Sequence, residues 1–376
     1  MLLQELIRIP SVNPDNASPE EAGVTHEQAM ADFLAEWLTG IGADVTFQEI
    51  QPRRPNLIAR FAPLDGRPRI LLGPHLDTVG VEGMTIDPFS GEIRDGRIWG
   101  RGACDTKGPM AAMLEALREN RSILADLPVA VDFVAFMGEE TSQDGSKHFA
   151  KKHASDYQFA IVGEPTSMDI VHLSKGSLWA ILTSTGLAAH ASQPHLGENA
   201  ILKMARALLT LQENLEPALA AYTDPILGYS TLNIGTISGG TRPNIVPDSA
   251  RVEIDIRQTP ALYSSGGALQ FLREMIAQLR LPLEIEHAHE NPPMQTDLQN
   301  PFIDKLLATD ARTKLVGAPW FSDAAHLSAA GIPSVCIGPG SIAQAHTKDE
   351  FIDIESFEEG RAFLSKFIRS LADYPK

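Results

Sequence analysis

Residues 69–77 read Arg-Ile-Leu-Leu-Gly-Pro-His-Leu-Asp, so a short apolar strand runs straight into a histidine, His75. Two later apolar runs end in the same way, one before Glu140 and the other before Glu164. In open α/β sheets the carboxyl ends of the strands are where ligands bind. We therefore expect these three polar side chains to lie along one functional edge of a sheet. The predicted strands span residues 69–72, 129–136 and 159–162.

The chain as a whole alternates helices with short apolar runs. This pattern predicts an α/β fold with a mostly parallel central sheet. The first clear helix starts near Thr25, which can form a capping box with Gln28, and it ends at Gly40. A closing helix is predicted over residues 354–371.

The middle of the chain has a different pattern, which suits a compact α+β unit inserted into the α/β domain. Its predicted strands cover residues 178–183, 231–237, 252–256 and 283–286, and its predicted helices cover residues 200–211 and 267–279. We therefore predict a first domain made of residues 1–173 and 290–376, and an inserted domain over residues 174–289.

The amino-acid composition argues against some classes of binding partner. The 376 residues include 31 Lys and Arg and 48 Asp and Glu, which give a formal net charge of −17. An acidic surface repels phosphate backbones and anionic lipids, so we expect neither nucleic acid nor membrane as a partner. No apolar run reaches the roughly 18 residues of a membrane helix, and we expect no signal peptide. Two cysteines do not make a disulfide scaffold, and the expected location is the cytoplasm.

Five residues with metal-binding side chains stand at strand ends or near glycine-flanked turns. They are His75, Asp105, Glu140, Glu164 and His346. Each alone is more often part of a solvated surface, but their shared placement favours a site for two ions. Asp105 lies between Gly102 and Gly108, where the backbone can turn sharply and a carboxylate can bridge two cations. Two imidazoles and three carboxylates suit zinc, cobalt or manganese. Water between two such ions becomes a nucleophile near neutral pH.

Two further acidic residues flank these candidates. Asp77 lies two residues after His75, on the same side of a continuing strand, and can accept a hydrogen bond from the second ring nitrogen of that histidine. Glu139 directly precedes Glu140, and adjacent side chains at the end of a strand point in different directions. Glu140 can therefore bind metal while Glu139 faces the cleft as a general base, which later returns the proton to a leaving amine.

These segments resemble the acetylornithine deacetylase / succinyl-diaminopimelate desuccinylase family of two-zinc hydrolases, which also includes aminoacylases and glutamate carboxypeptidases. The resemblance extends over nearly the whole chain, and the motifs are highly specific in combination. The matching segments are residues 73–79 (Gly-Pro-His-Leu-Asp-Thr-Val), 99–108 (Trp-Gly-Arg-Gly-Ala-Cys-Asp-Thr-Lys-Gly), 138–141 (Gly-Glu-Glu-Thr), 162–167 (Val-Gly-Glu-Pro-Thr-Ser) and 345–350 (Ala-His-Thr-Lys-Asp-Glu). One departure is Thr106, because the family often has methionine after the bridging aspartate.

The resemblance implies two divalent metal ions, with zinc expected and cobalt or manganese as alternatives. It implies that His75 and Glu164 hold one ion. Glu140 and His346 would hold the other ion, and Asp105 would bridge the two.

The same resemblance implies that Glu139 is the general base and that Asp77 orients His75. It also implies a zinc-peptidase-like catalytic domain with an inserted α+β lid that usually dimerises, so we expect a homodimer through the inserted domain.

His190, inside the inserted domain, has two readings. From the sequence alone it is a loop histidine. The resemblance implies instead that it polarises the scissile carbonyl, often from the other subunit, as a donor aimed at the developing oxyanion.

Three more residues are candidates for binding substrate. The resemblance implies that Asn244 and Arg257 bind the substrate carboxylate, a task that suits an arginine fork. The alternative for Arg257 is a surface salt bridge with Asp255 or Glu253. Gly340, within residues 338–341, could offer a main-chain N–H to an anion, and a simple turn explains it equally well.

We expect an enzyme that hydrolyses the amide bond of a small N-acyl amino acid. Residues 229–235 and 338–346 are most similar to the acetylornithine deacetylase branch, so N-acetyl-L-ornithine is the leading substrate and arginine biosynthesis the expected setting. A desuccinylase acting on succinyl-diaminopimelate, a dipeptidase and a carboxypeptidase are alternatives in the same fold. A non-catalytic ligand-binding module is less suited because it has no need of Glu139, and structural zinc sites favour cysteine over carboxylates.

Overall fold

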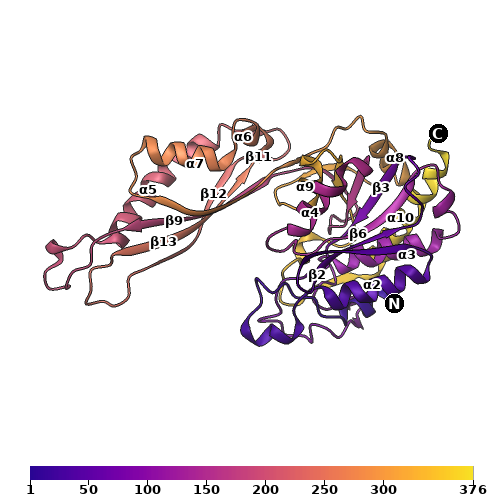
Figure 1. Cartoon of the computed structure of the whole chain (residues 1–376), viewed down its shortest axis with the longest axis horizontal. Helices are drawn as coiled ribbons and strands as arrows, with labels where there is room; N and C mark the ends of the chain where they lie inside the picture. The colour runs from indigo at the N-terminus through magenta and orange to yellow at the C-terminus, as the bar shows by residue number, and fades with distance from the viewer. Residues whose placement is uncertain (376) are drawn as a thin grey trace. The chain divides into compact units, whose positions relative to one another are not determined.

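The computed structural model describes residues 1–375, which form two compact units (Figure 1). Unit 1 consists of Met1–His172, Gln295–Val316 and Ser322–Lys376. Unit 2 consists of Leu173–Met294 and Gly317–Phe321.

A nine-stranded mixed sheet forms the centre of unit 1. Its order is β1 (Asp44–Gln51), β2 (Arg54–Arg60), β6 (Ala130–Ala135), β3 (Arg69–Gly73), β7 (Phe159–Val162), β17 (Ser334–Cys336), β8 (Ile170–Ser174) and β15 (Met294–Gln295), with β16 (Leu315–Ala318) pairing with β8. The four strands β6, β3, β7 and β17 run parallel, and β1 and β2 extend the sheet in antiparallel pairing. The predicted α/β fold with parallel strands at its centre is confirmed.

Helices cover the parallel strands on both faces, which explains why these strands are buried throughout and mostly apolar. One face packs against α1 (Leu2–Ile7), α2 (Gln28–Gly40), α3 (Lys107–Asn120), α8 (Pro301–Thr309) and α10 (Ile354–Ser370), and the other against α4 (Asp144–His153) and α9 (Asp323–Ala329). Ile70 and Leu72 of β3 enter the larger core with α3 and α10. On the other face Phe136 packs edge-on against Phe149 of α4, with 5.4 Å between ring centroids.

The start of α2 differs from the predicted capping box. The helix begins at Gln28 after Glu27, and the Thr25 hydroxyl donates to the carbonyl of Ala22 instead. The Glu27 carboxylate is buried and accepts hydrogen bonds from Nε and Nη2 of Arg54. This ion pair, together with the 3₁₀ turn at Pro19–Val24, fixes the entry to the helix in place of a cap.

A small antiparallel sheet brings the end of the chain beside the segment that contains Asp105. It consists of β4 (Glu92–Arg94), β5 (Arg97–Trp99) and β18 (Phe351–Asp353), in the order β18-β5-β4. Phe351 pairs with Trp99, so Glu350 lies next to the loop that follows β5.

Unit 2 has an antiparallel sheet in the order β12 (Thr231–Gly239), β13 (Ser249–Gln258), β9 (Gly176–Thr185) and β14 (Glu284–Asn291). Its other elements are α5 (Ala200–Leu219), β10 (Thr223–Asp224), β11 (Gly228–Tyr229), α6 (Pro260–Ser264) and α7 (Gly267–Gln278). Helices α5 and α7 lie on the same face of the sheet (Figure 1) and share its apolar core. The other face is open, so residues alternate between buried and accessible along β13.

Among residues 1–375, no helix combines the length and the apolar character needed to cross a lipid bilayer.

Candidate active site

Asp105 lies between two histidines that are far apart in the sequence. Its Oδ1 is 3.1 Å from Nε2 of His75, and its Oδ2 is 3.5 Å from Nε2 of His346. Glu140 also contacts His346, with 3.0 Å between Oε2 and Nε2. Ligand atoms of His75, Asp105 and Glu140 all lie within 4.8 Å of one another. A carboxylate that directs one oxygen to each of two imidazoles is suited to bridge a pair of cations.

Buried carboxylate oxygens without partners test whether these residues fit divalent cations. Oε1 of Glu140 and Oε1 of Glu164 are buried and accept no hydrogen bond within the described part of the chain. Buried polar atoms are almost always paired, and unpaired ones in a native site call for an explanation such as an ion. Asp105 and His75 are the charged neighbours that act most strongly on Glu164. Two imidazoles and three carboxylates, two of which have an oxygen without a partner, fit zinc, cobalt or manganese.

The charges of this cluster show the same need for cations. Burial raises the pKa of Glu139, Glu140 and Glu164, and repulsion from neighbouring carboxylates adds to the increase. A hydrogen bond with Glu140 raises the pKa of His346. The chain therefore concentrates negative charge where the dielectric constant is low, and bound cations would favour the ionised carboxylates.

Asp77 has more contacts than its spacing from His75 suggests. Nδ1 of His75 is 2.9 Å from the main-chain oxygen of Asp77 and 3.4 Å from its Oδ1. The Asp77 carboxylate also accepts hydrogen bonds of 3.1 Å from the N–H of Glu139 and from the N–H of Glu140. Asn13 donates a further hydrogen bond of 2.7 Å to Oδ2. Asp77 thus holds both His75 and the two consecutive glutamates.

Sequence reasoning did not single out Asn13 or Glu350, although both support this cluster. Asn13 follows no strand and belongs to no recognised motif, so its contact with Asp77 had no signal in the sequence. Glu350 ends the quoted segment 345–350, and its complete burial is visible only in the structure.

His190 and Asn244 lie in neighbouring loops of unit 2. His190 forms an isolated bridge with Ile245, and the N–H of Ala191 donates to the carbonyl of Asn244 over 3.1 Å. Nδ1 of His190 lies 2.7 Å from Oγ of Ser192. The imidazole is exposed, and its Nε2 has no hydrogen-bond partner among the described residues, so this nitrogen is available to a ligand.

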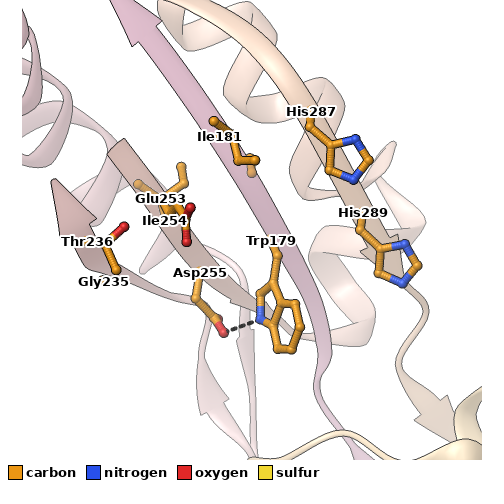
Figure 2. A pocket seen from close by; sticks show the side chains of 10 residues that line it. Trp179, Ile181, Gly235, Thr236, Glu253, Ile254, Asp255, His287 and His289 are labelled. Atoms are coloured by element: carbon orange, nitrogen blue, oxygen red, sulfur yellow. Dashed lines mark hydrogen bonds between the residues drawn. The ribbon is translucent and has the colours of Figure 1, made fainter. Parts of the chain in front are cut away.

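Arg257 forms an ion pair with Asp255, which was the alternative interpretation of this residue. Only part of its guanidinium takes part. Its Nε is 2.9 Å from Oδ1 of Asp255, while Oδ2 of Asp255 accepts a hydrogen bond of 2.6 Å from Nε1 of Trp179. Figure 2 shows the hydrogen bond between Trp179 and Asp255 on adjacent strands, with His287 and His289 along β14. The two Nη groups of Arg257 have no hydrogen-bond partner among the described residues. They can still bind a carboxylate in bidentate fashion.

A hollow of about 290 Å³ opens on this face of the sheet (Figure 2). It is lined by Trp179, Ala180, Ile181, Gly235, Thr236, Glu253, Ile254, Asp255, His287 and His289. Trp179 is exposed in this hollow, beside Asp255.

Gly340 serves a tight turn in unit 1. Its φ is +86°, and a Cβ atom at this position would lie 2.5 Å from Sγ of Cys104, so both the conformation and the space require glycine. Its N–H donates to Oγ of Ser356 over 3.0 Å, and the N–H of Gly338 donates to Oγ1 of Thr166 over 3.2 Å. These contacts correspond to the turn reading, since both N–H groups already have partners.

Comparisons with known proteins identify the family of the chain. Residues 71–370 match peptidase family M20/M25/M40. The chain is 32% identical over 387 residues to an acetylornithine deacetylase from Proteus mirabilis, covering 98% of this chain and 95% of that protein.

Two solved structures share the fold. An M20-family metallo-carboxypeptidase from Sulfolobus solfataricus superimposes with a TM-score of 0.80 at 19% identity, covering 99% of this chain and 98% of the other. A dinuclear metal-binding peptidase of the M20 family from Bacillus subtilis has a TM-score of 0.68 at 15% identity, with 99% and 97% covered. The chain is therefore a metallohydrolase that belongs to peptidase family M20/M25/M40.

Proposed function

We propose that this enzyme is an aminoacyl deacylase that hydrolyses the amide bond of an N-acyl amino acid, with N-acetyl-L-ornithine as its substrate. The observation that carries the proposal is the Asp105 carboxylate, which directs one oxygen to His75 and the other to His346. The similarity to acetylornithine deacetylases at 32% identity supports the choice of substrate within the family.

The residues proposed to hold two divalent cations are the five candidate ligands predicted from the sequence. His75 and Glu164 would hold one ion, Glu140 and His346 the other, and Asp105 both. Divalent cations supply Lewis acidity, which polarises a carbonyl group and lowers the pKa of water toward neutrality.

Glu139 is proposed to move the proton in this reaction. Its main chain is fixed by the hydrogen bond from its N–H to Asp77, while its side chain is not used as a ligand. The carboxylate accepts a proton from the attacking water as the new C–O bond forms. It then donates that proton to the amide nitrogen as the C–N bond breaks, which releases acetate and the free amine.

The second unit is proposed to bind the rest of the substrate. His190 would donate a hydrogen bond to the developing oxyanion through its free Nε2. The free Nη groups of Arg257, with Asn244, would bind the α-carboxylate. In this proposal residues 1–173 and 290–376 form the catalytic domain, while residues 174–289 form the lid through which two copies associate.

The test is a substrate screen with protein reconstituted with Zn²⁺, Co²⁺ or Mn²⁺. We expect kcat/KM for N-acetyl-L-ornithine to exceed that for N-succinyl-L,L-diaminopimelate and for dipeptides by about 100-fold, a selectivity that pocket contacts can supply. A chelator should abolish turnover, and added metal should restore it. Preferential hydrolysis of dipeptides or of the succinyl substrate would overturn the choice of acyl amino acid, and no hydrolysis of any amide would overturn the whole proposal.

A further inference from the structure

Glu350 is a fully buried carboxylate that lies outside the proposed ligand set. Its Oε1 accepts hydrogen bonds from the N–H of Cys104 at 2.8 Å and from the N–H of Asp105 at 2.9 Å. Its Oε2 accepts from the N–H of Gly102 at 3.0 Å and from Nη1 of Arg101 at 2.8 Å. One side chain thus binds three main-chain donors and one guanidinium of the loop that carries Asp105.

The same residue also joins this loop to the loop of His346. Glu350 follows His346 by four residues, and its main-chain oxygen accepts a hydrogen bond of 3.0 Å from the N–H of Gly100. Arg101 adds a second link, because its Nη1 also donates to the main-chain oxygen of Thr347 over 3.2 Å. His346 itself has a φ of +60°, a conformation that a non-glycine residue holds only when its surroundings enforce it.

The chemistry of these contacts requires a carboxylate. All four donors converge on two oxygens, and each oxygen accepts two of them. An amide in the same place would direct its own N–H groups at two of the donors, and a buried donor without an acceptor destabilises its position. The main-chain contacts at residues 102, 104 and 105 therefore depend on both oxygens of Glu350 being acceptors, as well as on its size.

We propose that Glu350 is a positioning residue for the metal centre. By binding the N–H of Asp105 and continuing directly into the loop of His346, it sets the separation at which these two ligands act on the same ions. This inference rests on the proposed function, because it holds that the contacts of Glu350 serve the proposed two-ion site.

The test replaces Glu350 by glutamine, which keeps the shape but replaces one acceptor oxygen and so removes two of the four hydrogen bonds, and by aspartate, which keeps both oxygens but shortens their reach. Asp353→Asn is the matched control, because Asp353 lies on the same segment and loses the same charge. Among residues 1–375 its carboxylate forms an ion pair with the exposed Arg97 alone, with 3.0 Å between Oδ1 and Nε.

The main readout is Co²⁺ binding to the metal-free protein, followed by visible absorption and by competition with a chelator. Loss of contacts that orient metal ligands typically weakens metal binding about 10–100-fold, and we expect Glu350→Gln to raise the Kd by this factor. The Kd of Glu350→Asp should lie between those of Glu350→Gln and the parent. The Kd of Asp353→Asn should stay within about twofold of the parent value, since an exposed ion pair contributes little. Unfolding of each metal-free variant is measured in parallel.

A purely structural role would lower the unfolding midpoint of the metal-free variants and leave the Co²⁺ Kd of the folded protein unchanged, which would overturn the inference. If Glu350→Gln does not fold, Glu350→Asp decides by the same criterion. Failure of the parent to bind two Co²⁺ ions would instead overturn the proposed function, so the two failures are distinguishable.

Discussion

Asn13 donates a hydrogen bond of 2.7 Å from Nδ2 to Oδ2 of Asp77. Both side chains are fully buried, and Asp77 in turn accepts the N–H groups of Glu139 and Glu140. The amide is therefore the last member of a chain of contacts that begins at the proposed base. A residue from the beginning of the sequence thus helps to fix the segment that follows β6.

Asn13→Ala should weaken this chain without touching a proposed ligand. A buried carboxylate that loses a donor costs about 1–3 kcal/mol of unfolding free energy, and metal affinity should fall about tenfold. Asn13→Asp should lower the unfolding free energy and the metal affinity further, because it places a second negative charge beside Asp77. Denaturant unfolding and metal titration check both variants. Wild-type metal affinity in Asn13→Asp would show that Asp77 does not support the centre.

Glu139 and Glu140 are consecutive residues with different proposed tasks, so their alanine variants should fail in different ways. Glu139→Ala should retain both metal ions while kcat falls about 10²–10⁴-fold, the range for a lost general base. Glu140→Ala should lose metal and activity together. Metal content by atomic spectroscopy and steady-state kinetics separate the two outcomes. Hydrolysis at the parental rate by Glu139→Ala would refute its role as base.

The strands that lead to the cluster could be predicted because their signal is local. A parallel strand covered on both faces is a short, continuous apolar run, so β7 was predicted at its observed bounds and β3 to within one residue. Helix α5 was predicted to end at Leu211 but continues to Leu219. Leu215 and Leu219 extend its buried stripe at the same spacing, and Pro217 lies inside the last turns without ending the helix.

Contacts between distant segments could not be predicted in this way. Nothing near Glu350 in the sequence indicates that its carboxylate binds main-chain N–H groups about 245 positions earlier. The capping box at Thr25 was wrong for a related reason, because the buried pair of Glu27 and Arg54 decides that helix start. The short strands β4, β5 and β18 were also missed, since three residues carry too little pattern. The sequence indicated metal-binding residue types, while the residues that position them appeared only in the fold.

Asp255 should control substrate binding through Arg257. In the parent, Oδ1 of Asp255 accepts from Arg257 and Oδ2 accepts from Trp179. Asp255→Asn replaces one of these oxygens by an NH2 group, so one of the two donors loses its acceptor. A hydrogen bond to a charged group contributes about 1.5–3 kcal/mol, so we expect KM for N-acetyl-L-ornithine to rise about tenfold or more with a smaller change in kcat. Glu253→Gln on the same face is the control. An unchanged KM in Asp255→Asn would contradict the role of Arg257 as carboxylate ligand.

Asp132, in the middle of β6, provides a pH-dependent contribution to stability that is independent of the metal cluster. Its Oδ1 is 2.6 Å from Nη1 of Arg69, and its Oδ2 accepts a hydrogen bond of 2.9 Å from the hydroxyl of Tyr157. Burial nevertheless raises the pKa of Asp132 from 3.8 to about 6, because the strand interior excludes water more than these partners compensate.

Between these two pKa values the folded chain holds a proton on Asp132 that the unfolded chain has released. The stabilisation from this group is therefore complete below the unfolded pKa and is lost as the pH rises through about 6. Asp132→Asn stays neutral, so the unfolding free energy of the parent relative to this variant should fall by about 2–3 kcal/mol over this window. Asp44 is exposed, and the unfolding free energy of Asp44→Asn should change with pH in the same way as that of the parent. A relative stability that increases with pH would mean that Arg69 keeps Asp132 ionised in the folded state.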